Sequence, residues 1–348
     1  MLECQASYIK NKGEQNLDKL ERSLIRDAMR IDIDVPIVMD DGLVLRADVF
    51  RPIAVGRFPV LLTYGPYGKG IAFQEGYRTA WEIMADRFPD AVAASTNRYQ
   101  NWEVVDPEKW VPHGYVCVRV DSRGAGRSPG YLCHNNARET RDIYHCIEWA
   151  AQQPWSTGKI GMNGISYYAS NQWRAAALQP PHLAAICVWE GWWDSYRDGA
   201  RHGGIACTFR KNWQDMQVKT VQHGVGESGK RSRVTGELVC GPEILPEAEL
   251  AANIAPLWQE LGGRALDDEY YQVRSAYWDK VKVPFLSCGN WGGNGLHLRG
   301  NVEGFVRAAS QEKWLEMHGG SHWAIFYTDY ANDLQRRFFD HYLKGEKN

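Results

Sequence analysis

Residues 31 to 52, IDIDVPIVMDDGLVLRADVFRP, alternate apolar and polar side chains on both sides of Asp41-Gly42. Alternation with a period of two is typical of strands with one covered face, and Asp-Gly favours the tight turn of a hairpin. The pattern therefore predicts a two-stranded hairpin that opens the folded domain. Residues 1–30 before it are expected to form an N-terminal extension.

Later apolar runs do not alternate, as is typical of strands covered on both faces. They are FPVLLTYGP, YVCVRVDSRG, KIGMNGIS, HLAAICVWEG, VPFLSCGN and KWLEMHGG. Stretches with helical spacing lie among them, at residues 135–154 and in SNQWRAAALQPP, and another closes the chain in DYANDLQRRFFDHYLKGEKN. Alternating strands and helices predict an α/β fold with a mostly parallel sheet and helices on both faces.

The pattern changes between residues 199 and 280, which are polar and rich in glycine. Helical fragments such as EAELAANIAPLWQELG occur there, but no clear strand does. The segment is too long for a simple connection. We therefore expect an inserted helical cap over the carboxyl edge of the sheet, which divides the α/β core into residues 31–198 and 281–348.

Composition and charge narrow the classes of function. The chain has 40 Lys and Arg against 42 Asp and Glu, a net charge of −2. No run of like charges suggests a nucleic-acid or membrane partner. The N-terminus lacks the apolar core of a signal peptide, and no segment has the apolar length of a membrane span. We expect a cytoplasmic protein that acts on a small molecule.

The cysteines do not indicate a metal site. None of the eight belongs to a CxxC pair, and Cys117, Cys187 and Cys288 lie inside apolar runs, where reduced cysteine behaves as a small hydrophobic residue. The adjacent pairs of Cys and His at 133–134 and 145–146 lack the spacing of a zinc site. No metal and no cofactor are expected.

The main chemical candidate is Ser166 in KIGMNGISYYASNQW, residues 159–173. Gly164 supplies the small residue that a nucleophile elbow needs two positions before the serine. An apolar run precedes Ser166 and a helical stretch follows it, but Tyr168 stands where a second glycine is usual. The context predicts a nucleophile on a strand-to-helix turn, whereas the alternative is an ordinary serine.

A serine nucleophile needs a general base, and in enzymes with such an elbow the histidine comes last in the chain. His322 in MHGGSHWAIFY follows a predicted strand on a Gly-Gly loop and is the expected base. His318 comes earlier, on or beside the strand. His297 and His202 are the other loop candidates.

Two further loops are expected to serve the same centre. The loop in TYGPYGKG, residues 63–70, follows a strand and stands where the second donor of an oxyanion hole is commonly supplied. The first donor is the backbone N–H after the nucleophile, which belongs to Tyr167. In VDSRGAGRSPG, residues 120–130, we expect the charged side chains to brace the loop.

The segments PYGK, DSRGAGRSPG, GISYYASNQW, GNWGG and HGGSHW, in this order, resemble the cocaine esterase and X-prolyl dipeptidyl-peptidase branch of the α/β-hydrolases. The resemblance covers residues 30 to 346. It implies that Ser166 is the nucleophile, that His322 is its base and that the Tyr67 hydroxyl joins the oxyanion hole. Members of the family cleave esters or amides through an acyl-enzyme, so a serine esterase, amidase or peptidase-like enzyme is implied.

The triad acid is missing from its usual place. The family usually carries an aspartate after the seventh strand, in a Gly-Trp-Tyr-Asp-like segment, but CGNWGGNGLHLRGN has no carboxylate before Glu303. Asp194 in VWEGWWDSYRD follows the sixth strand and is the expected substitute. Asp198, Glu190 and Glu303 stay open as alternatives, as does the absence of any acid.

The chain has 15 tryptophans, and a group of four is predicted to form an apolar pocket for the acyl or leaving group. The four are Trp189, Trp192, Trp193 and Trp323. An equally weighted alternative places them at the edge of the core beneath the cap.

The resemblance also implies a β-sandwich after a FFDHYLKGE-like segment, whereas this chain ends at Asn348. If a sandwich normally covers part of the sheet or cap, exposed apolar surface is expected to favour a homo-oligomer. The missing acid and the missing sandwich together motivate a second hypothesis, in which the hydrolase scaffold binds a ligand or partner without turnover.

Overall fold

A nine-stranded sheet forms the centre of the computed structural model, which describes residues 22–293 and 295–348. Its order is β1-β2-β3-β5-β4-β6-β7-β10-β11. The strands are β1 (Arg22–Arg26), β2 (Met29–Val38), β3 (Val44–Pro52), β4 (Phe58–Gly65), β5 (Val116–Asp121), β6 (Ser156–Ile165), β7 (Leu183–Trp189), β10 (Phe285–Asn290) and β11 (Lys313–His318). Each non-alternating apolar run forms a strand, and neighbours from β5 to β11 pair in parallel. The prediction of a mostly parallel sheet is confirmed.

Antiparallel strands form the other end of the sheet. β2 and β3 are the predicted hairpin, with Val38 paired to Val44 around the turn. β1 precedes them and joins β2 through Asp27 and Ala28, whose φ angles of 48° and 58° suit a two-residue hairpin turn. Residues 1–21 of the expected N-terminal extension lie outside the described residues, whereas residues 22–30 belong to the sheet.

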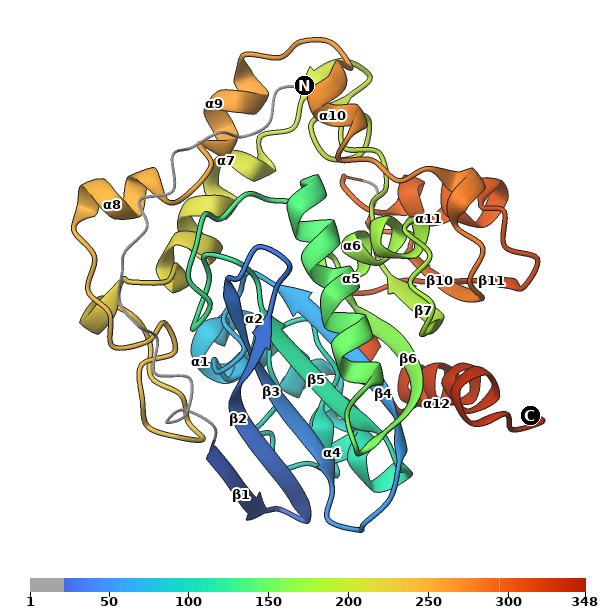
Figure 1. Ribbon diagram of the computed structural model, residues 1–348. Coiled ribbons are helices and arrows are strands. Elements are labelled where there is room, and N and C mark those ends of the chain that lie inside the picture. The colour runs from blue at the N-terminus through green and yellow to red at the C-terminus, as the bar shows by residue number, and fades with distance from the viewer. Residues whose placement is uncertain (1–21, 294) are drawn as a thin grey trace.

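Helices cover both faces of the sheet (Figure 1). α5 (Ala137–Ala151) and α6 (Tyr167–Ala177) pack on one face through side chains such as Ile143 and Trp173. α4 (Pro107–Trp110) and α12 (Asp329–Phe339) pack on the other face, where Trp110 and Phe339 contribute. The remaining core helices are α1 (Phe73–Gly76), α2 (Arg78–Arg87), α3 (Pro89–Val92) and α11 (Leu298–Arg307).

Residues 199–280 leave the core after β7 and return before β10, in yellow to orange in Figure 1. They hold a small hairpin, four short α-helices and further short 3₁₀ and π-helical segments. The hairpin strands and the α-helices are β8 (Arg201–His202), β9 (Ile205–Ala206), α7 (Phe209–Trp213), α8 (Glu247–Ala252), α9 (Leu257–Gly262) and α10 (Glu269–Gln272). Phe209 and Trp213 of α7 reach the pocket beside Ser166, which places this part of the segment over the carboxyl edge of the sheet.

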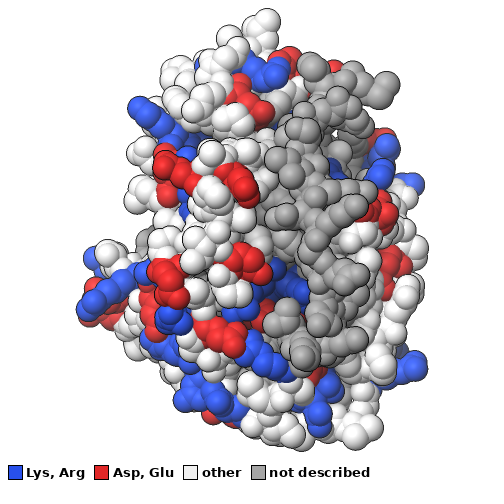
Figure 2. All heavy atoms as spheres, turned by 60° about the vertical axis from the view of Figure 1, so that its left-hand side comes forward, with Lys and Arg blue, Asp and Glu red and all other residues white. Residues whose placement is uncertain are grey.

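The surface carries both signs of charge. On the face drawn in Figure 2, Lys and Arg are interspersed with Asp and Glu. No helix in the described part of the chain is long and apolar enough to cross a membrane. Large apolar side chains are exposed at Trp291 in the loop after β10, at Val306 in α11 and at Trp314 in β11. The expected homo-oligomer stays a prediction.

Candidate active site

The carboxyl ends of the parallel strands bring the candidate residues together, as expected for ligand sites in α/β sheets. Ser166 follows β6, Glu190 follows β7 and His322 lies after β11. Tyr67 comes two residues after β4. All four line one pocket of about 390 Å³, which Phe209 of the segment 199–280 also borders.

Ser166 sits on a strained turn between β6 and α6. Its φ of 58° and ψ of −109° lie outside the ordinary regions for a residue with a side chain. Gly164 has a φ of 155°, and a Cβ there would lie 2.6 Å from the Cβ of Tyr168 and 3.1 Å from the carbonyl oxygen of Glu103. Only glycine fits at this position. The sequence analysis gave Gly164 this role, as the small residue two positions before the serine of the elbow.

Two glycines on neighbouring strand ends explain why Tyr168 is tolerated where a second elbow glycine is usual. A Cβ on Gly65, at the end of β4, would lie 2.5 Å from the ring of Tyr168. A Cβ on Gly191, after β7, would lie 3.0 Å from the Cβ of Ala169. The space that the elbow needs is therefore provided by β4 and β7 instead of by the start of α6.

The carboxylate that holds His322 belongs to Glu190, which was an alternative to Asp194 in the sequence analysis. His322 Nδ1 donates to Glu190 Oε2 at 2.7 Å. Glu190 is fully buried and its other oxygen accepts from Asn290 Nδ2 at 3.0 Å and lies 3.2 Å from Nε2 of His318. Burial raises the pKa of Glu190, but the charge of His322 and the bonds from both histidines outweigh burial and lower that pKa.

The other acid candidates face different partners. Asp194 Oδ2 pairs with Arg197 at 2.9 Å, and its Oδ1 accepts two backbone N–H groups of the following turn. Asp198 pairs with Arg299 at 2.8 Å. Glu303 pairs with Arg307 at 3.2 Å across one turn of α11. The structure thus places Glu190, and not Asp194, at the expected base.

A second carboxylate, that of Glu103, meets His322 from the opposite side. His322 Nε2 donates to Glu103 Oε1 at 3.1 Å. Burial raises the pKa of Glu103, whereas His322 and the nearby Ser166 hydroxyl lower it by less. The Glu103 carbonyl also accepts the N–H of Ile165, at 2.9 Å, so the loop carrying Glu103 is attached to the elbow.

The imidazole of His322 therefore lies between two carboxylates. Burial lowers the pKa of His322, but the charge of Glu190 and the bonds to Glu103 and Glu190 outweigh burial and raise it. Glu103 and Glu190 have φ angles of 64° and 54°. Both share with Ser166 the left-handed backbone that side chains rarely adopt, and such strain concentrates at functional sites.

His297, another loop candidate, contacts Ser166 directly. Its Nε2 lies 3.1 Å from Ser166 Oγ, and its Nδ1 accepts the backbone N–H of Trp192 at 3.2 Å. Because a backbone N–H only donates, the ring proton of neutral His297 resides on Nε2 and points at Oγ. Burial, together with the charge of His322, holds the pKa of His297 well below its ordinary value. His297 is therefore a neutral donor.

Tyr67 and Tyr167 stand where oxyanion donors are expected. Trp213 Nε1 donates to the Tyr67 hydroxyl oxygen at 3.0 Å, and among the described residues the Tyr67 O–H has no acceptor of its own. Burial and the charge of Glu103 raise the pKa of Tyr67, which keeps its proton in place. Tyr167 is the first residue of α6, so its N–H has no acceptor within the helix.

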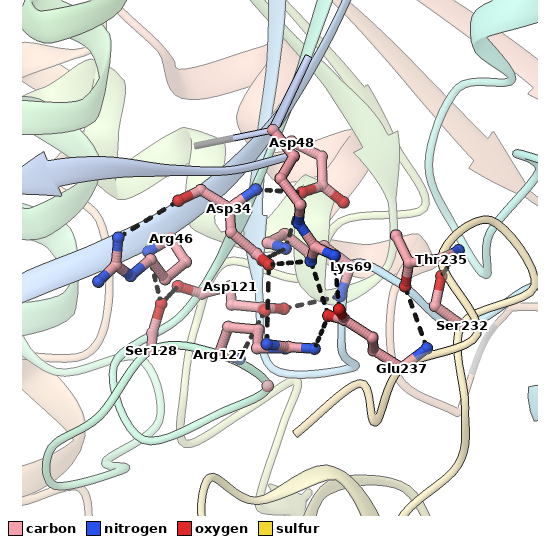
Figure 3. Close-up of polar contacts among 12 residues, drawn as sticks. Asp34, Arg46, Asp48, Lys69, Asp121, Arg127, Ser128, Ser232, Thr235 and Glu237 are labelled. Carbon is pink, nitrogen blue, oxygen red and sulfur yellow. Dashed lines mark hydrogen bonds and ion pairs between the residues drawn. The ribbon is translucent and has the colours of Figure 1, made fainter. Parts of the chain in front are cut away.

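A buried ionic cluster fixes the loop that carries Tyr67 (Figure 3). Lys69 Nζ lies 2.7 Å from Asp34 Oδ1 and 2.8 Å from Asp48 Oδ1. Its backbone N–H donates to Asp121 Oδ1 at 2.7 Å. Buried, fully paired charges of this kind hold a loop in one geometry, here two residues away from Tyr67.

The charged side chains of residues 120–130 make contacts that brace their loop. Arg123 Nε donates to Asp142 of α5 at 2.9 Å. Arg127 Nη2 donates to Glu237 at 2.9 Å, which ties this loop to the segment 199–280. Neither arginine lines the pocket at Ser166.

The four tryptophans proposed for the pocket take different positions. Trp192 lines the space beside Ser166. Trp189 is fully buried and stacks on His318 at 4.8 Å, and Trp193 stacks on another indole at 4.7 Å. Trp323 donates to a backbone carbonyl of α2 at 3.0 Å. Core packing therefore accounts for Trp189 and Trp193.

Sequence reasoning did not identify Glu103, Trp213 or Arg210 at the site. Arg210 and Trp213 lie in α7, within a segment without clear periodicity. Glu103 had a usable signal, since it is a single carboxylate inside the apolar run from Trp102 to Val105. A lone charge in such a run is rarely buried without a partner.

Comparisons with known proteins agree with this architecture. The model of the X-Pro dipeptidyl-peptidase (S15) family matches residues 41–324. Cocaine esterase of a Rhodococcus species is 32% identical over 346 residues, which cover 90% of this chain and 55% of the esterase. A putative serine esterase of Mycobacterium bovis is 27% identical over 182 residues, or 51% of this chain and 27% of that protein.

A solved structure extends the likeness to three dimensions. A CocE/NonD family hydrolase from Staphylococcus aureus is 34% identical, with a TM-score of 0.77 over 97% of this chain and 57% of that chain. The expected α/β-hydrolase fold is thereby confirmed. The chain spans about half the length of that hydrolase and of cocaine esterase.

Proposed function

Since the chain belongs to the X-Pro dipeptidyl-peptidase (S15) family, we propose that it is a serine hydrolase that cleaves an acyl ester or amide through an acyl-enzyme. The observation that carries the proposal is the contact of 2.7 Å between Glu190 and His322 beside a strained Ser166. It supplies the acid that the sequence lacks after β10. A nucleophile, a base and an orienting acid are the parts that two-step acyl transfer needs.

In the proposed reaction Ser166 Oγ attacks the substrate carbonyl while His322 Nε2 accepts its proton. Glu190 holds the imidazole through Nδ1 and stabilises the charge that develops there. The Tyr67 hydroxyl and the Tyr167 N–H donate to the oxyanion, next to the positive end of α6. His322 then protonates the leaving group, and water releases the acid from Ser166 by the same steps.

His322 must lose one proton before it can act as a base. As an imidazolium it donates from both nitrogens, to Glu190 and to Glu103. Loss of the Nε2 proton leaves a lone pair that repels the Glu103 carboxylate and can accept from the Ser166 hydroxyl instead. Catalytic hydrogen bonds commonly tighten only when substrate is bound. The proposal therefore implies an activity that rises with pH as the His322 imidazolium loses its proton and becomes neutral.

A fluorophosphonate probe tests the proposal, because it reacts only with an activated serine. Labelling of the folded chain that disappears in Ser166→Ala is the expected result. Ser170→Ala is a matched control, since Ser170 is buried in α6 and stands outside the residues that line the pocket. A folded protein that takes up no label would favour the alternative of a scaffold that binds without turnover.

A further inference from the structure

A narrow branch of the active-site pocket is lined by Ser166 but by neither Glu103 nor His322. Asn135, Trp192 and Arg210 line it, together with Ser166 and Trp213. Its volume is about 20 Å³. A space of this size holds about one or two water molecules, which is also the size of a carboxylate group.

Arg210 is buried in this branch without an acidic partner. The residue is 6% exposed. Among the described residues its guanidinium makes no ion pair and no hydrogen bond, and its one specific contact is the face of Trp192 at 4.9 Å. Gly199 leaves room for it, because a Cβ there would lie 2.5 Å from Nη2 of Arg210. The donors of Arg210 are thus unused beside the nucleophile.

Other buried arginines nearby show how unusual this is. Arg174 donates to the side chain of Asn135, and Arg274 Nη1 donates to the carbonyl of Tyr270 at 3.0 Å. Arg119, elsewhere in the core, donates to two backbone carbonyls. Burying a guanidinium without hydrogen-bond acceptors costs free energy. We therefore expect a bound ligand to supply the acceptor for the N–H groups of Arg210.

The part of the substrate that reaches Arg210 follows from the geometry of acyl transfer. His322 protonates the leaving group, so the leaving group lies on the side of Ser166 where His322 stands. The acyl chain extends to the other side, into the branch that holds Arg210. A guanidinium binds a carboxylate through parallel, charge-assisted hydrogen bonds, and the branch has room for such a group.

We propose that Arg210 binds a carboxylate on the acyl part of the substrate, so that the preferred substrates are monoesters or monoamides of short dicarboxylic acids. The inference rests on the proposed serine hydrolase activity and adds the class of acyl group. On the side of the leaving group, Glu103 and Glu190 would repel a second anion. The substrate is therefore anionic at its acyl end only.

Two p-nitrophenyl esters of nearly equal shape test this. The hemisuccinate ends in a carboxylate where the butyrate ends in a methyl group. We expect the wild-type protein to have the higher kcat/KM for the hemisuccinate. In Arg210→Gln the ratio of the two kcat/KM values should fall about 10- to 100-fold, since one charge-assisted interaction is lost. Lys211→Gln removes the same charge from an exposed position of α7, and should leave the ratio as in wild type.

Each failure has a distinct signature. If neither ester is hydrolysed and the fluorophosphonate does not label Ser166, the serine hydrolase proposal has failed. If both esters are hydrolysed but Arg210→Gln keeps the wild-type ratio, the role of Arg210 is wrong. A wild-type preference for the butyrate ester also overturns the role of Arg210, and that measurement uses the wild-type protein alone.

Discussion

His322 and His297 lie face to face, with ring centroids 5.2 Å apart and planes 6° from parallel, yet their surroundings are opposite. His322 contacts two carboxylates, whereas His297 contacts a backbone N–H and a serine hydroxyl. The pKa of His322 is raised and that of His297 is lowered. One residue type thus gives a proton acceptor and a fixed donor, because neighbouring charges and burial set the protonation state.

Because only His322 of the two contacts carboxylates, we assign base catalysis to His322 and not to His297. Replacing the His322 ring should therefore have the largest effect on activity. We expect His322→Asn to lower kcat/KM for p-nitrophenyl butyrate by about 10⁴-fold or more, since removal of a triad base leaves only binding and oxyanion stabilisation. Steady-state kinetics at one pH suffice to measure this. Comparable losses in His322→Asn and His297→Asn would break the distinction between the two rings.

The carboxylate on Nδ1 is expected to have the next largest effect. Glu190→Gln keeps the shape of the side chain but removes the charge that stabilises the imidazolium, and we expect kcat to fall about 10³- to 10⁴-fold. Asp194→Asn is the matched control, because Asp194 follows the same strand but pairs with Arg197. If Asp194→Asn loses kcat while Glu190→Gln retains it, the orienting acid has been assigned to the wrong residue.

The carboxylate on Nε2 should alter the pH profile. The charge of Glu103 stabilises imidazolium and so raises the pKa of His322. Removing that charge in Glu103→Gln lowers the pKa, and the neutral base then persists to lower pH. We expect the acid limb of kcat/KM against pH to move down by about one pH unit. A limb that stays in place, or moves up, would contradict this role for Glu103.

The architecture was largely predictable from the sequence, because it depends on local patterns. Uninterrupted apolar runs marked the parallel strands, and alternation around Asp41-Gly42 marked the hairpin. The positions of Ser166 and His322 followed from their places after a strand. The segment 199–280 was less predictable, since its α-helices of four to six residues are too short to show a period.

The partners around His322 were not predictable to the same degree, because they depend on side-chain direction. Glu190 and Asp194 both follow β7. Glu190 turns toward His322 through a φ of 54°, whereas Asp194 accepts the N–H groups of its own turn. Glu103 meets His322 from a loop 219 residues away in sequence. Neither the sign of a φ angle nor a contact between residues so far apart in the sequence can be predicted from the local pattern of apolar and polar residues.

The smallest effect is expected for the neutral ring. His297→Asn removes a donor to Ser166 Oγ but no charge, so we expect kcat/KM to fall by about 10-fold or less, the value of one ordinary hydrogen bond. The acid limb of the pH profile should stay at its wild-type position, because a neutral imidazole contributes no charge to the pKa of His322. A shift of that limb in His297→Asn would mean that His297 itself takes up a proton, and the two histidines would then share the base between them.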